Sequence, residues 1–266
     1  MWLYKKRFET QEFFIPENAY IRGNKLFISK NLSVKLARSI PSNGVVGNAV
    51  RLYYRTKWYA SFTVTTPDIE IAKIEPTNLI GIDIGFRKYA TLSDGTYIEN
   101  PRWTKQYARK LAHWQRKLSR QQKGSNRRII IKKRIAKIHA AIANHRKHFS
   151  HLQSKLIANK YEAVCLENHS LKTQTKLFGK SLHDVGHGHF RSCMTYKMAD
   201  RGKILVLADQ FFPSSKLCSK CGLKNEELKM QEKWTCSGCG TVHNRDFNAA
   251  KNLEAYGRRQ VTTDQV

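Results

Sequence analysis

Acidic side chains are scarce in this sequence. Its 266 residues include 20 Asp and Glu against 48 Lys and Arg, which gives a formal net charge of +28 at pH 7. Such an excess of positive charge repels itself unless a polyanion neutralises it, and nucleic acid is the natural polyanionic partner. A basic protein of a membrane surface is the alternative, but the sequence lacks the long apolar span or amphipathic anchor that this class requires. We therefore expect nucleic acid, and no membrane, as the partner.

A secretory signal is also missing. The first eight residues, Met1 to Phe8, contain no apolar run followed by small residues, so we expect a cytoplasmic protein. Cysteines stay reduced in that compartment. The six cysteines of this chain therefore suggest metal binding before disulfide bonds.

The length allows one well-packed domain and a smaller module. Residues 1–76 contain short alternating apolar segments, interrupted by Pro and Gly, and predict a small antiparallel β module. A second unit, residues 77–266, begins with an apolar run around Asp83 and two further short segments, which predict a three-stranded meander. Another apolar run ends at Glu167. Together these segments predict an α/β domain.

Residues 102–160 contain no acid at all. Apolar residues recur there at helical spacing on both sides of Gly124-Ser125, which predicts two helices that share one apolar seam. The expected seam consists of Leu111, Trp114, Leu118, Ile131, Ile135, Ile138, Ile142, Phe149, Leu152 and Leu156. The eighteen basic residues of the segment are at positions 102, 105, 109, 110, 116, 117, 120, 123, 127, 128, 132, 133, 134, 137, 146, 147, 155 and 160.

Two C-x-x-C pairs, each followed by Gly, lie fourteen residues apart: Cys218 with Cys221, and Cys236 with Cys239. A two-residue gap lets one tight turn direct two thiolates at the same ion, so the paired turns predict a zinc ribbon with a structural Zn²⁺. A pair of redox-active dithiols is the alternative, but it lacks the βαβ context of such proteins. We interpret Cys165 and Cys193 as ordinary buried thiols.

Three acids stand at element edges: Asp83, Glu167 and Asp246. A charge inside the apolar run around Asp83 must be compensated, and a divalent cation would do so, although Asp83 alone could instead cap a turn. Glu167 could pair with an arginine, and Asp246 could be a helix N-cap. Taken together, the three predict a site for two Mg²⁺ ions, because Mg²⁺ prefers hard oxygen ligands, and two such ions promote phosphodiester hydrolysis.

A third group of possible ligands is His183, His187 and His189. A second metal site is one hypothesis for them. Glycine spacing, with no helix or strand expected to fix the rings, favours a loop that touches nucleic acid.

The motif blocks in their order resemble the TnpB family of transposon-encoded, RNA-guided DNA endonucleases, which are related to the single-protein type V CRISPR effectors. The resemblance runs from about residue 45 to residue 254. The blocks are Gly81-Ile82-Asp83-Ile84-Gly85 with Ser93-Asp94-Gly95, Leu166-Glu167-Asn168, Phe212-Pro213-Ser214-Ser215-Lys216 with the first cysteine pair, and the second cysteine pair with Arg245-Asp246-x-Asn248-Ala249-Ala250.

The resemblance implies an RNase H-like (RuvC) mixed sheet over residues 77–266, with a basic helical insertion (102–160) and an inserted zinc ribbon (213–243). It implies catalysis by Asp83, Glu167 and Asp246, and DNA and a guide RNA as partners. Members of the family carry a wedge β-barrel interrupted by a helical recognition domain. Residues 1–76 are expected to be the last part of that wedge, with the recognition domain missing. Position 244 is Asn, where the family often has an acid.

Three functions remain open from the sequence. The first is an Mg²⁺-dependent, RNA-guided DNA endonuclease of a prokaryotic or viral transposon. The second is a truncated, non-cutting nucleic-acid binder or repressor of the same family. The third is a sugar-kinase or actin-like ATPase, which also opens with an acidic strand, but this class needs a second phosphate loop that the sequence lacks.

Overall fold

The computed structural model of the chain describes residues 12–15, 20–29, 32–37, 45–54, 58–65, 76–168, 186–229 and 231–263. The chain divides into two compact units, Met1–Glu70 and Ile71–Val266, and each is described by itself. Within the described residues, every helix is too short or too polar to cross a bilayer.

The first unit consists, in its described part, of short antiparallel strands. They form two three-stranded sheets, of order β1-β5-β6 and β2-β3-β4. The strands are β1 (Glu12–Ile15), β2 (Tyr20–Arg22), β3 (Lys25–Ser29), β4 (Leu32–Lys35), β5 (Val45–Tyr54) and β6 (Trp58–Thr65). Five of these six strands were predicted, by the apolar segments 13–15, 25–28, 33–36, 49–54 and 58–64 of the sequence. Strand β2 was not expected, because three residues are too few to show an alternation.

The second unit is built on a five-stranded mixed sheet of order β11-β10-β7-β8-β9. Its strands are β7 (Leu79–Ile84), β8 (Lys88–Leu92), β9 (Tyr97–Glu99), β10 (Ala163–Glu167) and β11 (Ile204–Ala208). Strands β7, β8 and β9 form an antiparallel meander, and β10 runs parallel to both β7 and β11. The predicted meander is confirmed, and Gly95, at φ 90°, lies in the turn between β8 and β9.

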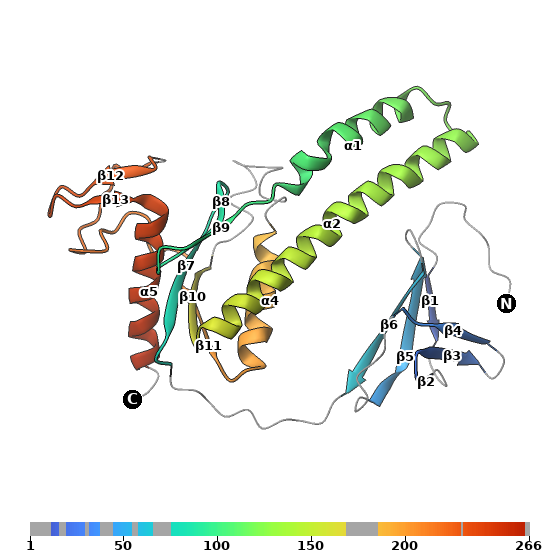
Figure 1. Ribbon diagram of the computed structural model, residues 1–266, viewed down its shortest axis with the longest axis horizontal. Coiled ribbons are helices and arrows are strands. Elements are labelled where there is room, and N and C mark those ends of the chain that lie inside the picture. Colours follow the sequence, from blue (N-terminus) through green and yellow to red (C-terminus); the bar gives the residue numbers. More distant parts are fainter. Residues whose placement is uncertain are drawn as a thin grey trace. The chain divides into compact units, whose positions relative to one another are not determined.

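Helices cover both faces of this sheet (Figure 1). One face packs on α2 (Asn126–Lys160) and α4 (His187–Ala199), and the other on α5 (Arg245–Thr263). Alternation along β7 sends Ile80 and Ile82 into the core on the α2 and α4 side. The residues between them therefore face α5.

The basic segment forms two helices, α1 (Trp103–Ser119) and α2, which pack against each other. Ser125 caps α2 by accepting a hydrogen bond from the Arg128 N–H at 3.2 Å, which satisfies one of the free amides of the first turn. The predicted pair of helices and the break between them are confirmed.

The predicted seam is wrong at the end of α2. Ile131, Ile138 and Ile142 are buried as expected, but Leu152 and Leu156 are 42% and 54% exposed. Beyond Phe149 the helix lies on the sheet and buries Ser150, Ser154, Ile157 and Ala158 instead. The buried face of α2 therefore changes where its packing partner changes from α1 to the sheet and α4. A single periodicity along the sequence does not show this change of partner.

Candidate functional site

Helix α5 lies against β7 and β10 at very close range. A methyl group on Gly81 would stand 2.1 Å from the Ala250 carbonyl oxygen and 2.3 Å from the Glu254 nitrogen. A methyl group on Gly257 would stand 2.8 Å from Cβ of Cys165. Because only glycine leaves this space free, Gly81 and Gly257 determine how closely α5 approaches the sheet and in which direction it runs.

This packing brings the three predicted acids to one level. Gly81 lies beside the Ala250 turn of α5, while Gly257 lies closer to Leu79, so the helix runs opposite to β7. Asp83 is two strand residues beyond Gly81, about 6.6 Å along β7. Asp246 is four helical residues before Ala250, about 6 Å in the same direction.

Glu167 reaches the same level from β10. The parallel register pairs Cys165 with Gly81 and Leu166 with Ile82, so Glu167 follows beside Asp83 at the end of the paired segment. Cys165 packs in the cluster on the α5 side, and alternation places Glu167 on that same face. All three acids are half-buried.

Their mutual repulsion is visible at Asp83. Burial, and then the negative charges of Glu167 and Asp246, raise the pKa of Asp83 well above its ordinary value. The Arg245 guanidinium acts in the opposite direction. A buried acid whose ionisation is opposed by two neighbouring carboxylates marks a candidate cation site or a site of proton chemistry.

The neighbours of the other two acids orient them. The Ser214 hydroxyl donates a hydrogen bond to Oε1 of Glu167. Arg245 donates from Nε and from a terminal nitrogen to Oδ1 of Asp246, both at 3.2 Å. Within the described residues, the three carboxylates are not among the groups whose ligand atoms all lie within 4.8 Å of one another. The arrangement is therefore an open one.

Two asparagines that the sequence analysis gave no role tie α5 to the cysteine-containing segment. The Asn248 amide donates to the Leu217 carbonyl at 2.6 Å and accepts from the Ser219 N–H at 2.9 Å. The Asn252 amide donates to the carbonyls of Ser214 and Leu217, both at 2.7 Å. The signal in the sequence was their i, i+4 spacing on the same side of the helix as Ala249.

Asn244, the departure from the family pattern, accepts a hydrogen bond from the Phe247 N–H at 3.1 Å. This is the geometry of a helix N-cap, in which Asn performs as well as Asp. The start of α5, with Asp246 in its first turn, is therefore secured without an acid at position 244.

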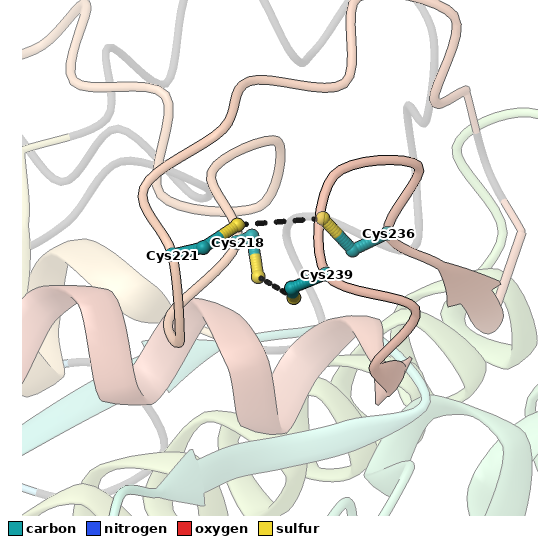
Figure 2. Close-up of side chains that lie close together, drawn as sticks. All are labelled: Cys218, Cys221, Cys236 and Cys239. Carbon is teal, nitrogen blue, oxygen red and sulfur yellow. Dashed lines mark hydrogen bonds between the residues drawn. The ribbon is translucent and has the colours of Figure 1, made fainter.

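The four predicted zinc ligands come together in one cluster (Figure 2). Sγ of Cys218 lies 3.6 Å from Sγ of Cys239, and Sγ of Cys221 lies 3.6 Å from Sγ of Cys236. A tetrahedral Zn²⁺ with Zn–S bonds of about 2.3 Å needs sulfurs about 3.8 Å apart. The cluster is compatible with structural zinc.

A short hairpin supports this cluster. It consists of β12 (Lys233–Thr235) and β13 (Val242–Asn244). On β13, Nε2 of the buried His243 lies 3.0 Å from Sγ of Cys218. An N–H at that position would donate to a metal-bound thiolate, the role that groups around a metal commonly play. The sequence analysis missed His243, because no spacing rule includes it.

Two of the three neighbouring histidines lie in the described part of the chain. His187 and His189 are in the first turn of α4, so the expectation of a loop without a helix is wrong for these two, and His183 lies outside the described residues. Cys193, expected to be an ordinary buried thiol, is buried but lies beside His151 and His189.

The basic segment presents its charge to solvent. All of its eighteen Lys and Arg are exposed except Arg128 and Arg146. Arg128 donates to the carbonyls of Leu118 and Gln121 at 2.8 and 3.0 Å, and Arg146 donates to Thr104 at 2.5 Å. Two arginines thus join the helices, while the others form a candidate surface for a polyanion.

Two family models match this sequence. Residues 61–175 match the family described as "Probable transposase", and residues 187–253 match the one described as "Cas12f1-like, TNB domain". A Streptomyces pristinaespiralis protein named "Putative RNA-guided DNA endonuclease" is 37% identical over 184 residues, which cover 68% of this chain and 46% of that protein. InsQ of Escherichia coli (strain K12), named in the same way, is 27% identical over 96% of this chain and 68% of its own length.

Solved structures share the fold. The cryo-EM structure of a CRISPR-Cas12f ternary complex matches with a TM-score of 0.52 at 20% identity, over 78% of this chain and 45% of the other. A Cas12f1–sgRNA–target DNA complex matches with a TM-score of 0.54 at 18% identity, over the same shares. The chain thus spans about half the length of the first curated relative and of these structures.

Proposed function

The chain belongs to the TnpB family, and from that premise we propose that it is a transposon-associated, RNA-guided DNA endonuclease. The observation that carries the proposal is that Asp83, Glu167 and Asp246 lie at the same height along the sheet, on the face that α5 covers. The negative charges of Glu167 and Asp246 contribute to the raised pKa of Asp83. The strand order β11-β10-β7-β8-β9 with parallel β10 and β11 supports an RNase H-like nuclease domain over residues 77–266.

We assign catalysis to these three carboxylates as oxygen ligands. Their repulsion is what a divalent cation would relieve, and their open spacing leaves room for a phosphate between them. Two bound Mg²⁺ ions would stabilise the charge developing on the phosphate and lower the pKa of the attacking water.

The chain's own residues set the geometry for this reaction. Ser214 orients the Glu167 carboxylate through its hydrogen bond, and α5 holds Asp246 at the level of Asp83 through the contact at Gly81. Arg245 lies beside Asp246 and would offer a positive charge to a phosphate bound at the carboxylates. These residues position the ligands and the substrate.

The remaining parts fit the same function. Residues 213–243 are proposed to be a zinc ribbon with Cys218, Cys221, Cys236 and Cys239 as the ligands of a structural Zn²⁺. The exposed basic surface of residues 102–160 is proposed to track the backbone of a guide RNA and its DNA target, for which positive charge is sufficient because base pairing supplies the sequence. Residues 1–76 are proposed to be part of a wedge module.

The test is cleavage by the purified chain together with its co-purified RNA, with DNA that carries the complement of that RNA. Asp83→Asn keeps the shape of the side chain and removes its charge. Loss of one ligand should cost several kcal/mol of transition-state stabilisation, on the order of 10³-fold in rate, with RNA and DNA binding unchanged. Glu99→Gln, a change of an exposed acid on β9, is the matched control and should cut like the wild type.

Equal cleavage by Asp83→Asn and the wild type would refute the catalytic assignment. Salt-sensitive binding of DNA and RNA without cleavage by the wild type would favour the second function, a non-cutting binder of the same family.

A further inference from the structure

A second group of metal-type ligands lies between α2 and α4. It consists of His151 from α2, and of His189 and Cys193, which are four residues apart on α4. Residues at i and i+4 share one face of a helix, and that face meets α2 here. The ligand atoms of all three side chains lie within 4.8 Å of one another.

The distances match a tetrahedral zinc site. Sγ of Cys193 lies 3.6 Å from Nδ1 of His151 and 3.7 Å from Nε2 of His189. With Zn–S bonds of about 2.3 Å and Zn–N bonds of about 2.0 Å, tetrahedral angles place sulfur and nitrogen about 3.5 Å apart. The imidazole rings are nearly perpendicular, at 83° with centroids 5.2 Å apart, so each can direct one nitrogen at a common point.

The cluster is separate from the two sites already described. The carboxylates lie on the α5 face of the sheet, whereas α2 and α4 cover the opposite face. The four-cysteine cluster belongs to a different segment of the chain. Cys193 is 1% exposed and His151 is exposed, so the cluster runs from the core to solvent and leaves a fourth position for water.

The surroundings hold the ligands in place. Nζ of Lys197 donates to the His151 carbonyl at 2.5 Å and to the Ser154 hydroxyl at 2.7 Å.

We propose that His151, His189 and Cys193 bind one Zn²⁺ ion that links α2 to α4, with water as the fourth ligand. Sulfur and imidazole nitrogen are ligands that zinc prefers and Mg²⁺ avoids. The Cys193 thiolate partly offsets the positive charge that Lys197 and the ion bring to the site. This zinc is additional to the one proposed for the four cysteines.

The test is the zinc content of the full chain after dialysis against micromolar free Zn²⁺, measured by mass spectrometry. The wild type should hold two zinc ions per chain, and His151→Ala, His189→Ala and Cys193→Ala should each hold one. His139→Ala, an exposed histidine on the same helix, and Cys165→Ala, a buried cysteine on β10, are the controls and should hold two.

Cobalt provides an independent measurement. A mild chelator first removes the more weakly bound zinc from zinc-loaded chains. Co²⁺ is then added, and the wild type should show the visible absorption of a tetrahedral thiolate site, whereas Cys193→Ala should show none. His151→Ala is the decisive variant, because an exposed side chain is removed without a core cavity. A zinc content that is the same in the wild type and in folded His151→Ala, whether one or two ions per chain, would overturn the proposal.

Discussion

The four-cysteine cluster and the three-carboxylate group are assembled in opposite ways. The cysteines come from two tight turns within Cys218 to Cys239, whereas the acids come from β7, β10 and α5, at Asp83, Glu167 and Asp246. The cysteine cluster therefore depends on local spacing. The acid group depends on strand register and on how closely one helix approaches the sheet.

The two sites nevertheless share α5. Asn248 and Asn252 bind the chain just before and within the first cysteine pair, and Asp246 is in the first turn of the same helix. A change at the cysteines can therefore reach Asp246, while a change at the sheet should leave the cysteines intact. Each of the following predictions tests that asymmetry.

The largest effect is expected from Cys236→Ala. Structural zinc contributes on the order of 10 kcal/mol to the folding of a small module, so residues 213–243 should lose zinc and unfold, while the five-stranded sheet remains. Hydrogen exchange should become fast in that module and in the first turns of α5, and should stay slow in β7 and β10. Slow exchange throughout the module in the zinc-free variant would contradict the prediction.

A smaller global effect, but a strong effect on activity, is expected from Gly81→Ala. The new methyl group would stand 2.1 Å from the Ala250 carbonyl, and such overpacking costs about 1–3 kcal/mol. Helix α5 must shift away from Asp83, and a misplacement of about 1 Å can lower a rate about 100-fold. Cleavage should therefore fall while the zinc bound by the four cysteines is retained.

Gly238→Ala is the matched control for this change. Its methyl group would be too close only to Cδ2 at the far end of the Leu223 side chain, at 2.9 Å, which can turn away; Cβ and Cγ of Leu223 lie at the ordinary contact distances of 3.6 and 3.7 Å. Cleavage and thermal stability should stay near those of the wild type. Equal losses of cleavage in the two variants would show that the distance between α5 and the sheet does not determine the position of the three acids.

Asn252→Ala should have a moderate effect. The buried amide donates to the carbonyls of Ser214 and Leu217. Leu217 keeps the hydrogen bond from Asn248, so the variant leaves the Ser214 carbonyl without this donor, which costs about 1–2 kcal/mol. Urea unfolding should show this loss, and the zinc of the cysteine cluster should become easier to remove by a chelator. Asn159→Ala, an exposed asparagine at the end of α2, should leave both measurements unchanged.

The sequence predicted what local patterns determine. The cysteine cluster, the meander around Asp83 and the two basic helices are confirmed, because turn spacing and periodicity act over a few residues. The predicted burial of Leu152 and Leu156 was wrong, since the partner of α2 changes along its length. Nothing in a single period shows which neighbour a long helix will meet.

The histidines show the same limit more clearly. The sequence grouped His183, His187 and His189 because they are close along the chain. The structure groups His189 with His151 and Cys193 instead, because a helix face meets a second helix. The roles of Gly81 and Gly257 also appear only when α5 lies on the sheet.

The smallest effect concerns the charge of Asp83 in the absence of Mg²⁺. Its pKa is raised in the folded chain, first by burial and then by Glu167 and Asp246, so the folded state binds this proton more tightly than the unfolded state. The stabilisation by the proton is fully present below the unfolded pKa, about 3.9, and is lost as the pH rises through the higher folded value.

Asp83→Asn is neutral at every pH and should therefore be more stable than the wild type at neutral pH without Mg²⁺. This advantage should shrink as the pH falls towards about 4, because protonation then removes the same charge from Asp83. Thermal unfolding of both proteins across this range, with zinc retained, measures the difference. Added Mg²⁺ should stabilise the wild type more than the variant, since only the wild type presents all three carboxylates. A difference in stability that is independent of pH and of Mg²⁺ would mean that the three acids do not act on one another. The three-carboxylate group would then not be a cation site, whereas the evidence for the four-cysteine cluster would be unaffected.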